Sequence, residues 1–93
     1  PTTAKWEGNI NVSKLSKYLN LSDDQHKEVA NICEYFSEQM SRATNSKKNQ
    51  EKLLRNAVYG NLKLMKKTLN EKQYADYAKV LNITLLNKGI RVE

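Results

Sequence analysis

The 93-residue chain suits one small domain with a simple core, because a chain of this length buries only about two thirds of its unfolded surface. Apolar residues make up 39% of the sequence, which is too many for a disordered chain, and 16 lysines and arginines against ten acidic residues give a net charge of +6. No apolar stretch approaches the roughly 20 residues that a membrane-spanning helix needs, so the sequence predicts none.

The first ten residues form a polar arm that contains Trp6 and Gly8 and has no apolar period. The arm also lacks the charged-then-apolar pattern of a signal peptide. Because Pro1 is not an ordinary initiator, we expect a mature or trimmed chain, which is compatible with a removed leader. Residues 11–93 are then predicted to form a single helical domain.

Helices are the predicted structure because the sequence lacks the turn residues and the alternating pattern that are typical of a β protein. Glycine occurs only at positions 8, 60 and 89, proline occurs only at position 1, and apolar and polar residues do not alternate. The first predicted helix covers residues 12–19 and is capped by Asn11. Its apolar face comprises Val12, Leu15 and Leu19.

The second predicted helix covers residues 22–44 and begins with a capping box. Ser22 and Gln25 have the required spacing, in which the serine hydroxyl accepts from the Gln25 amide while the Gln25 side chain reaches back. The following apolar residues advance by one, three or four positions, as on one face of a helix: Val29, Ile32, Cys33, Phe36, Met40 and Ala43. The polar stretch 44–49 predicts a turn, and a bent continuous helix is the alternative.

Two further helices are predicted over residues 50–68 and 71–87. The apolar face of the third helix comprises Leu54, Ala57, Val58, Leu62, Met65 and Leu69, widened by Leu53 and Leu64. The face of the fourth comprises Tyr74, Tyr77, Ala78, Leu81 and Leu85, and Gly89 is placed to end it in a left-handed conformation. The predicted fold is therefore all-α: a small antiparallel hairpin or bundle of about four helices, closed within one chain or by dimerisation.

Charge is unevenly distributed along the chain. Residues 21–41 hold five acidic residues and one lysine, whereas residues 42–72 hold nine basic residues and two acidic ones. Within the basic segment, six residues repeat at spacings of three and four and share one helix face, which we call the basic stripe: Lys48, Lys52, Arg55, Tyr59, Lys63 and Lys66. The stripe is either a solvated lysine face or a docking surface for an acidic partner.

Candidates for catalysis are few. The single histidine, His26, lies on the polar side of a helix start, and the single cysteine, Cys33, lies on an apolar stripe where a thiol is usually inert. The sequence has no clustered ligands for a transition metal and no glycine-rich phosphate loop. We therefore expect a protein that is not an enzyme and that has no catalytic residues, bound metal or cofactor.

Two helix starts share one frame, 48 residues apart: Leu21-Ser22-Asp23-Asp24-Gln25 and Leu69-Asn70-Glu71-Lys72-Gln73. This pair resembles the LTxxQ motifs of the Spy/CpxP-like family of small periplasmic helical proteins, with Ser22 and Asn70 in place of the family's threonine. Two ordinary capping boxes are the alternative interpretation.

The resemblance implies a periplasmic or secreted dimer that acts as an ATP-independent chaperone or stress-response modulator, with cytoplasmic location as the alternative. Leu21, Ser22, Gln25, Leu69, Asn70 and Gln73 would then be structural motif residues, and the basic stripe would face unfolded or acidic protein partners. The alternative functions are nonspecific nucleic-acid binding, and an adaptor or inhibitor that docks one specific protein.

Overall fold

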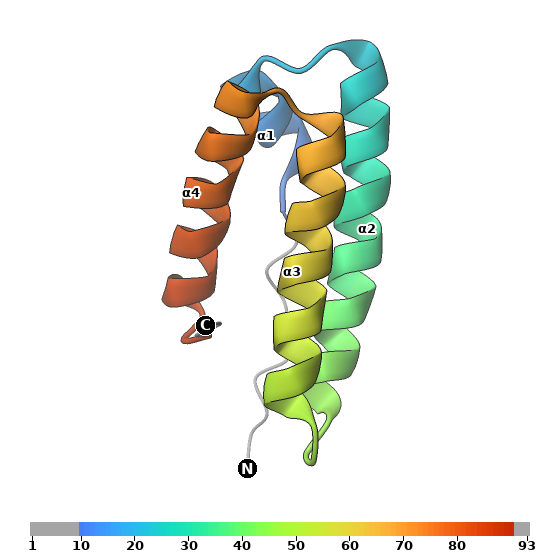
Figure 1. Cartoon of the computed structure of the whole chain (residues 1–93), viewed down its shortest axis with the longest axis vertical. Coiled ribbons are helices and arrows are strands. Elements are labelled where there is room, and N and C mark those ends of the chain that lie inside the picture. The colour runs from blue at the N-terminus through green and yellow to red at the C-terminus, as the bar shows by residue number, and fades with distance from the viewer. Residues whose placement is uncertain (1–9, 91–93) are drawn as a thin grey trace.

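The computed structural model describes residues 10–90, so residues 91–93 and all of the expected polar arm except Ile10 lie outside the described residues. Residues 10–90 form four α-helices and no strand. The helices are α1 (Val12–Leu19), α2 (Asp23–Asn45), α3 (Gln50–Thr68) and α4 (Glu71–Asn87) (Figure 1). The predicted all-α fold class is confirmed, and every helix boundary lies within one residue of its predicted position.

The polar stretch between α2 and α3 is a turn, and the alternative of one bent helix does not occur. Ser46 follows α2 with an extended backbone, although its N–H still donates to the Ala43 carbonyl oxygen at 3.1 Å. Gln50 Nε2 donates to the Thr44 carbonyl oxygen, also at 3.1 Å. This bond ties the start of α3 to the end of α2 and closes a helical hairpin.

Left-handed residues end α1 and α4. Asn20 has a φ of 58° and Gly89 a φ of 73°, values that asparagine and glycine adopt more readily than other residues. Beyond Gly89, the Ile90 N–H donates back to the Leu85 carbonyl oxygen at 2.9 Å, which satisfies one of the last carbonyl groups of α4. Gly89 therefore ends the fourth helix as the sequence predicts.

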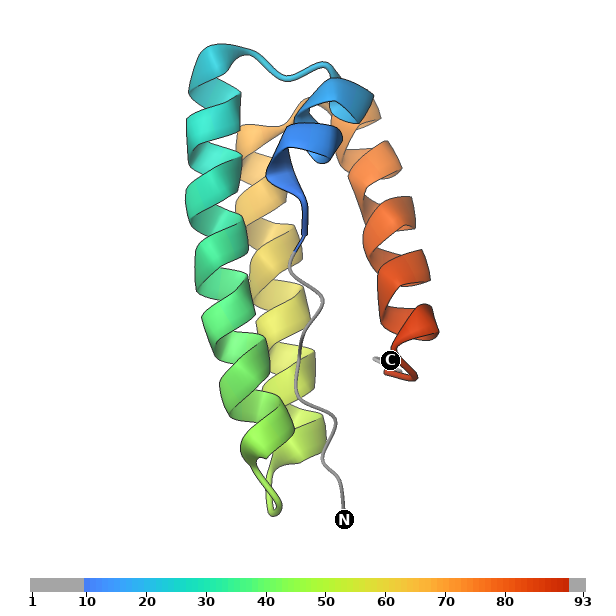
Figure 2. The same ribbon diagram turned by 180° about the vertical axis from the view of Figure 1, so that it is seen from behind.

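The hairpin of α2 and α3 runs the length of a molecule that measures 41 × 22 × 19 Å. The helices α1 and α4 join it near the end where α2 begins and α3 finishes, and the view from behind shows α1 between α2 and α4 (Figure 2). From there α4 runs back along the hairpin, and it diverges from α3 toward its carboxyl end in both views. None of the described helices is both long enough and apolar enough to cross a membrane.

The core is built from the predicted apolar faces. Five large side chains in it are almost completely buried: Val29, Phe36, Met40, Met65 and Tyr77. The prediction is wrong for Leu53 and Leu64, which are 38% and 37% exposed instead of widening the core face of α3. Both leucines lie on a flank of α3 that its neighbours cover only in part.

Replacing Phe36 by alanine should lower the free energy of unfolding by about 3–5 kcal/mol, because the ring is 2% exposed and its removal leaves a cavity in the core. Urea unfolding followed by circular dichroism measures the change. The neighbouring Tyr35 is 52% exposed, so Tyr35→Ala is the matched control and should change stability by only about 0.5 kcal/mol. Equal effects of the two substitutions would contradict the observed core.

Candidate functional site

Both predicted helix starts are complete capping boxes. The Ser22 hydroxyl accepts from the Gln25 N–H at 3.1 Å, and Gln25 Oε1 accepts from the Ser22 N–H at 3.0 Å. The second box repeats this geometry, because Asn70 Oδ1 accepts from the Gln73 N–H at 2.8 Å and Gln73 Oε1 accepts from the Asn70 N–H at 3.0 Å. Each box satisfies two backbone donors that the first turn of a helix leaves unpaired.

The two glutamines of the capping boxes also contact each other. Gln25 Nε2 donates to Gln73 Oε1 at 2.8 Å, and Gln73 Nε2 donates to Gln25 Oε1 at 3.3 Å. Each amide also donates to the end of a helix that precedes the partner's box: Gln25 to the Thr68 carbonyl oxygen at 3.1 Å, and Gln73 to that of Leu19 at 3.2 Å. We call this arrangement the glutamine pair.

The glutamine pair joins four helix ends at one place. It links the last turns of α1 and α3 to the first turns of α2 and α4, although the two side chains are 48 residues apart in sequence. Gln73 is only 8% exposed, so its amide could not recover these hydrogen bonds from water. Leu21 and Leu69 pack against the core beside the pair, with Leu69 itself buried.

The basic stripe lies on the outer face of α3. All six of its side chains are exposed: Lys48, Lys52, Arg55, Tyr59, Lys63 and Lys66. Tyr59 is the apolar member, with 49% of its surface exposed. Five of the six lie on α3, and Lys48 lies in the turn just before it. One straight face thus presents several cations at intervals of about one helical turn.

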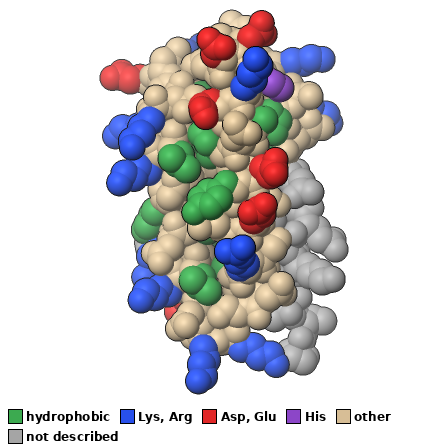
Figure 3. Space-filling view, turned by 90° about the vertical axis from the view of Figure 1, so that its right-hand side faces the viewer, with side chains coloured by type: hydrophobic (Ala, Val, Ile, Leu, Met, Phe, Trp, Pro, Cys, Tyr) green, Lys and Arg blue, Asp and Glu red, His purple; other side chains and the backbone are tan. Residues whose placement is uncertain are grey.

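Acidic side chains occupy a neighbouring surface. Figure 3 views the molecule from the side of α2 and shows acidic groups at the top and middle of this face, with lysines and arginines along the left edge and at the lower end. Within residues 10–90, no ion pair joins the two sets of charges. Direct ion pairs with these acidic groups therefore do not neutralise the stripe within the described part of the chain.

The two residues with familiar reactive side chains occupy different environments. Cys33 is a free thiol in the core at 7% exposure, and burial raises its pKa from 9.0 to about 11. His26 is half-buried at the start of α2, where its backbone N–H donates to the Ser22 carbonyl oxygen at 2.8 Å. Over residues 10–90, no cluster of three or more histidine, cysteine or acidic residues is placed to hold a metal ion.

A buried polar contact between α3 and α4 was not predicted from the sequence. The Tyr77 hydroxyl donates to Asn61 Oδ1, and both side chains are buried. Burial, and secondarily the nearby Cys33, raises the pKa of Tyr77 above its usual range despite this hydrogen bond. Asn61 Nδ2 has no partner among the described residues. The sequence does contain a signal for a buried polar residue, because Asn61 lies four positions from both Ala57 and Met65 on an otherwise apolar stripe.

Comparisons of the chain with models of protein families, with curated proteins and with solved structures found no match.

Replacing Gln73 by methionine, which keeps its length but removes its amide, should destabilise the protein by about 1–3 kcal/mol. Gln25→Met should have a similar effect, and the double variant should cost about 0.5–3 kcal/mol less than the sum because the two amides share bonds. Denaturant unfolding of the native protein, the two single variants and the double variant gives the four free energies of this double-mutant cycle. Gln39→Met is the control, since the Gln39 side chain donates to the hydroxyl of the exposed Tyr35 and to no other group among residues 10–90. Strictly additive effects would show that the pair is not coupled.

Cys33 should react slowly with thiol reagents in the folded protein. A pKa raised from 9.0 to about 11 leaves roughly 100-fold less thiolate at pH 8, and the thiolate is the reactive form. The rate of reaction with a chromogenic disulfide is measured from the absorbance of the released thiol. The rate in buffer should be at least about 100-fold lower than the rate in denaturant, as the difference in thiolate predicts. Raising the pH from 8 to 10 should speed the folded reaction. Equal rates in buffer and denaturant would place Cys33 outside the core.

Proposed function

We propose that the chain is a non-enzymatic binding protein that holds unfolded or acidic protein partners on the basic stripe. The observation that carries the proposal is that all six stripe residues are exposed on one face, without ion pairs among the described residues. A row of like charges attracts an anionic partner over a long range and raises the rate of encounter. A neutral surface would not provide this long-range attraction.

Weak holding and release follow from the composition of the stripe. Exposed ion pairs contribute only about 0–1 kcal/mol each and are screened by salt, so several lysines bind a partner without trapping it. Tyr59 adds one aromatic ring that can contact an apolar side chain of the partner. This combination suits a protein that holds many partners briefly better than one that forms a permanent complex.

The cell envelope is the proposed location, and an ATP-independent chaperone or a stress-response modulator is the proposed role. Support comes from the resemblance of the two helix starts to the LTxxQ motifs, because Gln25 and Gln73 contact each other as a matched pair. We also propose a homodimer. Ile83 and Leu86 on α4 are 58% and 56% exposed, and dimerisation would cover apolar side chains of this kind.

Charge reversal tests the basic stripe. A variant with Lys52, Arg55, Lys63 and Lys66 all changed to glutamate should lose most of its ability to suppress the aggregation of a reduced acidic client at low salt, because attraction becomes repulsion. Light scattering at a stoichiometric ratio measures the suppression. Equal protection by the native and reversed chains, or no protection by the native chain, would leave the stripe as a solvated face.

The matched control reverses four other exposed lysines: Lys17, Lys27, Lys72 and Lys79. It has the same net charge as the stripe variant and should protect the client better.

Filter binding to duplex and single-stranded DNA at two salt concentrations tests the alternative function. Tight binding that falls steeply with salt would favour nucleic acid as the partner.

Light scattering of the native chain alone tests the homodimer. A monomer at high micromolar concentration would remove the homodimer from the proposal.

A further inference from the structure

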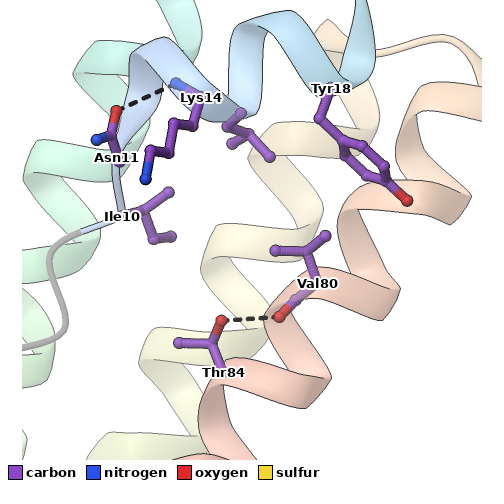
Figure 4. Close-up of a pocket in the computed structure, with 7 residues that line it drawn as sticks. Ile10, Asn11, Lys14, Tyr18, Val80 and Thr84 are labelled. Atoms are coloured by element: carbon purple, nitrogen blue, oxygen red, sulfur yellow. Dashed lines mark hydrogen bonds between the residues drawn. The ribbon is translucent and has the colours of Figure 1, made fainter.

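A hollow of about 320 Å³ opens between α1 and α4, away from the basic stripe. Ile10 and Leu15 line it from the side of α1, and Val80 lines it from α4. Figure 4 shows Ile10 and Val80 on opposite sides of the hollow, with the Tyr18 ring hanging from α1 toward α4. The volume lies at the lower end of the range for small-molecule sites.

The wall of the hollow offers little to a polar ligand. The Thr84 hydroxyl already donates to the Val80 carbonyl oxygen at 2.8 Å, so its hydrogen is not available. Asn11 also lines the hollow, but its Oδ1 accepts from the Lys14 N–H at 3.1 Å as the cap of α1. Three aliphatic side chains, together with these two bonded polar atoms, favour an apolar chain in this part of the space.

One charged side chain lines the hollow. Lys14 is exposed, and Figure 4 shows its side chain running from α1 toward Ile10, at the edge of the hollow opposite Val80. Among residues 10–90 it forms no ion pair with a carboxylate. A long basic side chain at the edge of an apolar surface is expected to keep its ammonium group in water while its stem lies along the apolar wall.

We propose that this hollow binds a single-chain amphiphile with an anionic head, such as a medium-chain carboxylate. The acyl chain lies between Ile10, Leu15 and Val80, and the carboxylate accepts a charge-assisted hydrogen bond from the Lys14 ammonium. An amphiphile with a cationic head is disfavoured, because its charge would lie beside Lys14. The hollow differs in this respect from the basic stripe, where cations are many and apolar contacts few.

Three probes with the same number of carbon atoms separate the contributions of head and chain. Octanoate, octanol and octylamine are each titrated into the protein while the methyl signals of Ile10, Leu15 and Val80 are followed by NMR. The affinities obtained from these shifts should be highest for octanoate, lower for octanol and lowest for octylamine. The signals of the exposed methyl groups of Leu53 on α3 should not change. Saturable shifts confined to the three lining residues support the proposal.

Lys14→Met keeps the apolar stem of the side chain and removes its charge. It should weaken octanoate binding about fivefold and leave octanol binding unchanged. Lys17→Met is the matched control, because Lys17 is an exposed lysine of the same helix that does not line the hollow. Equal affinity for octanoate and octylamine, an equal loss of octanoate affinity in both variants, or the absence of a saturable shift would overturn the proposal. Shifts that depend on protein concentration without ligand would also overturn it, because they would indicate that a second copy of the chain occupies the hollow.

Discussion

Four helix ends meet at one pair of side-chain amides, and the arrangement of the domain depends on that meeting. Gln25 and Gln73 each complete a capping box, bond the other amide and donate to a helix that ends nearby. An amide side chain has both donors and acceptors, so two amides can satisfy each other and the adjacent backbone together. A purely apolar contact would bury the same area without fixing which helix end lies against which. The pair therefore specifies an arrangement as well as adding stability.

The rest of the fold extends from this junction. The α2–α3 hairpin is closed at its far end by a short turn and is packed along its length by Phe36, Met40 and Met65. In contrast, α4 diverges from α3 beyond the junction, and its contacts there include the polar bond from Tyr77 to Asn61. A buried polar contact requires a particular partner, because breaking it leaves a donor or acceptor unsatisfied. It thus helps to set how α4 lies on α3.

The two surfaces proposed for binding follow from this architecture. The hairpin packs one face of α3 into the core and leaves the basic stripe toward solvent, so the cations project from one side of a helix. The divergence of α4 has a different result, because α1 and α4 leave a hollow with apolar walls beside Lys14. One surface is rich in charge and poor in apolar contact, and the other is the reverse. The two would select partners of different chemistry.

Local patterns in the sequence were enough to predict the helices, their caps and most of the core. The apolar period of α2 from Val29 to Ala43 and the glycine after α4 depend on neighbouring residues only, and the structure has both as predicted. The contact between Gln25 and Gln73, the bond between Asn61 and Tyr77, and the exposure of Leu53 and Leu64 were decided by tertiary packing. Helical period places a residue on a face, but only the position of the other helices determines whether that face is covered. The sequence by itself therefore determined which residues are helical and which share a face, whereas the tertiary structure decided which faces and amides meet.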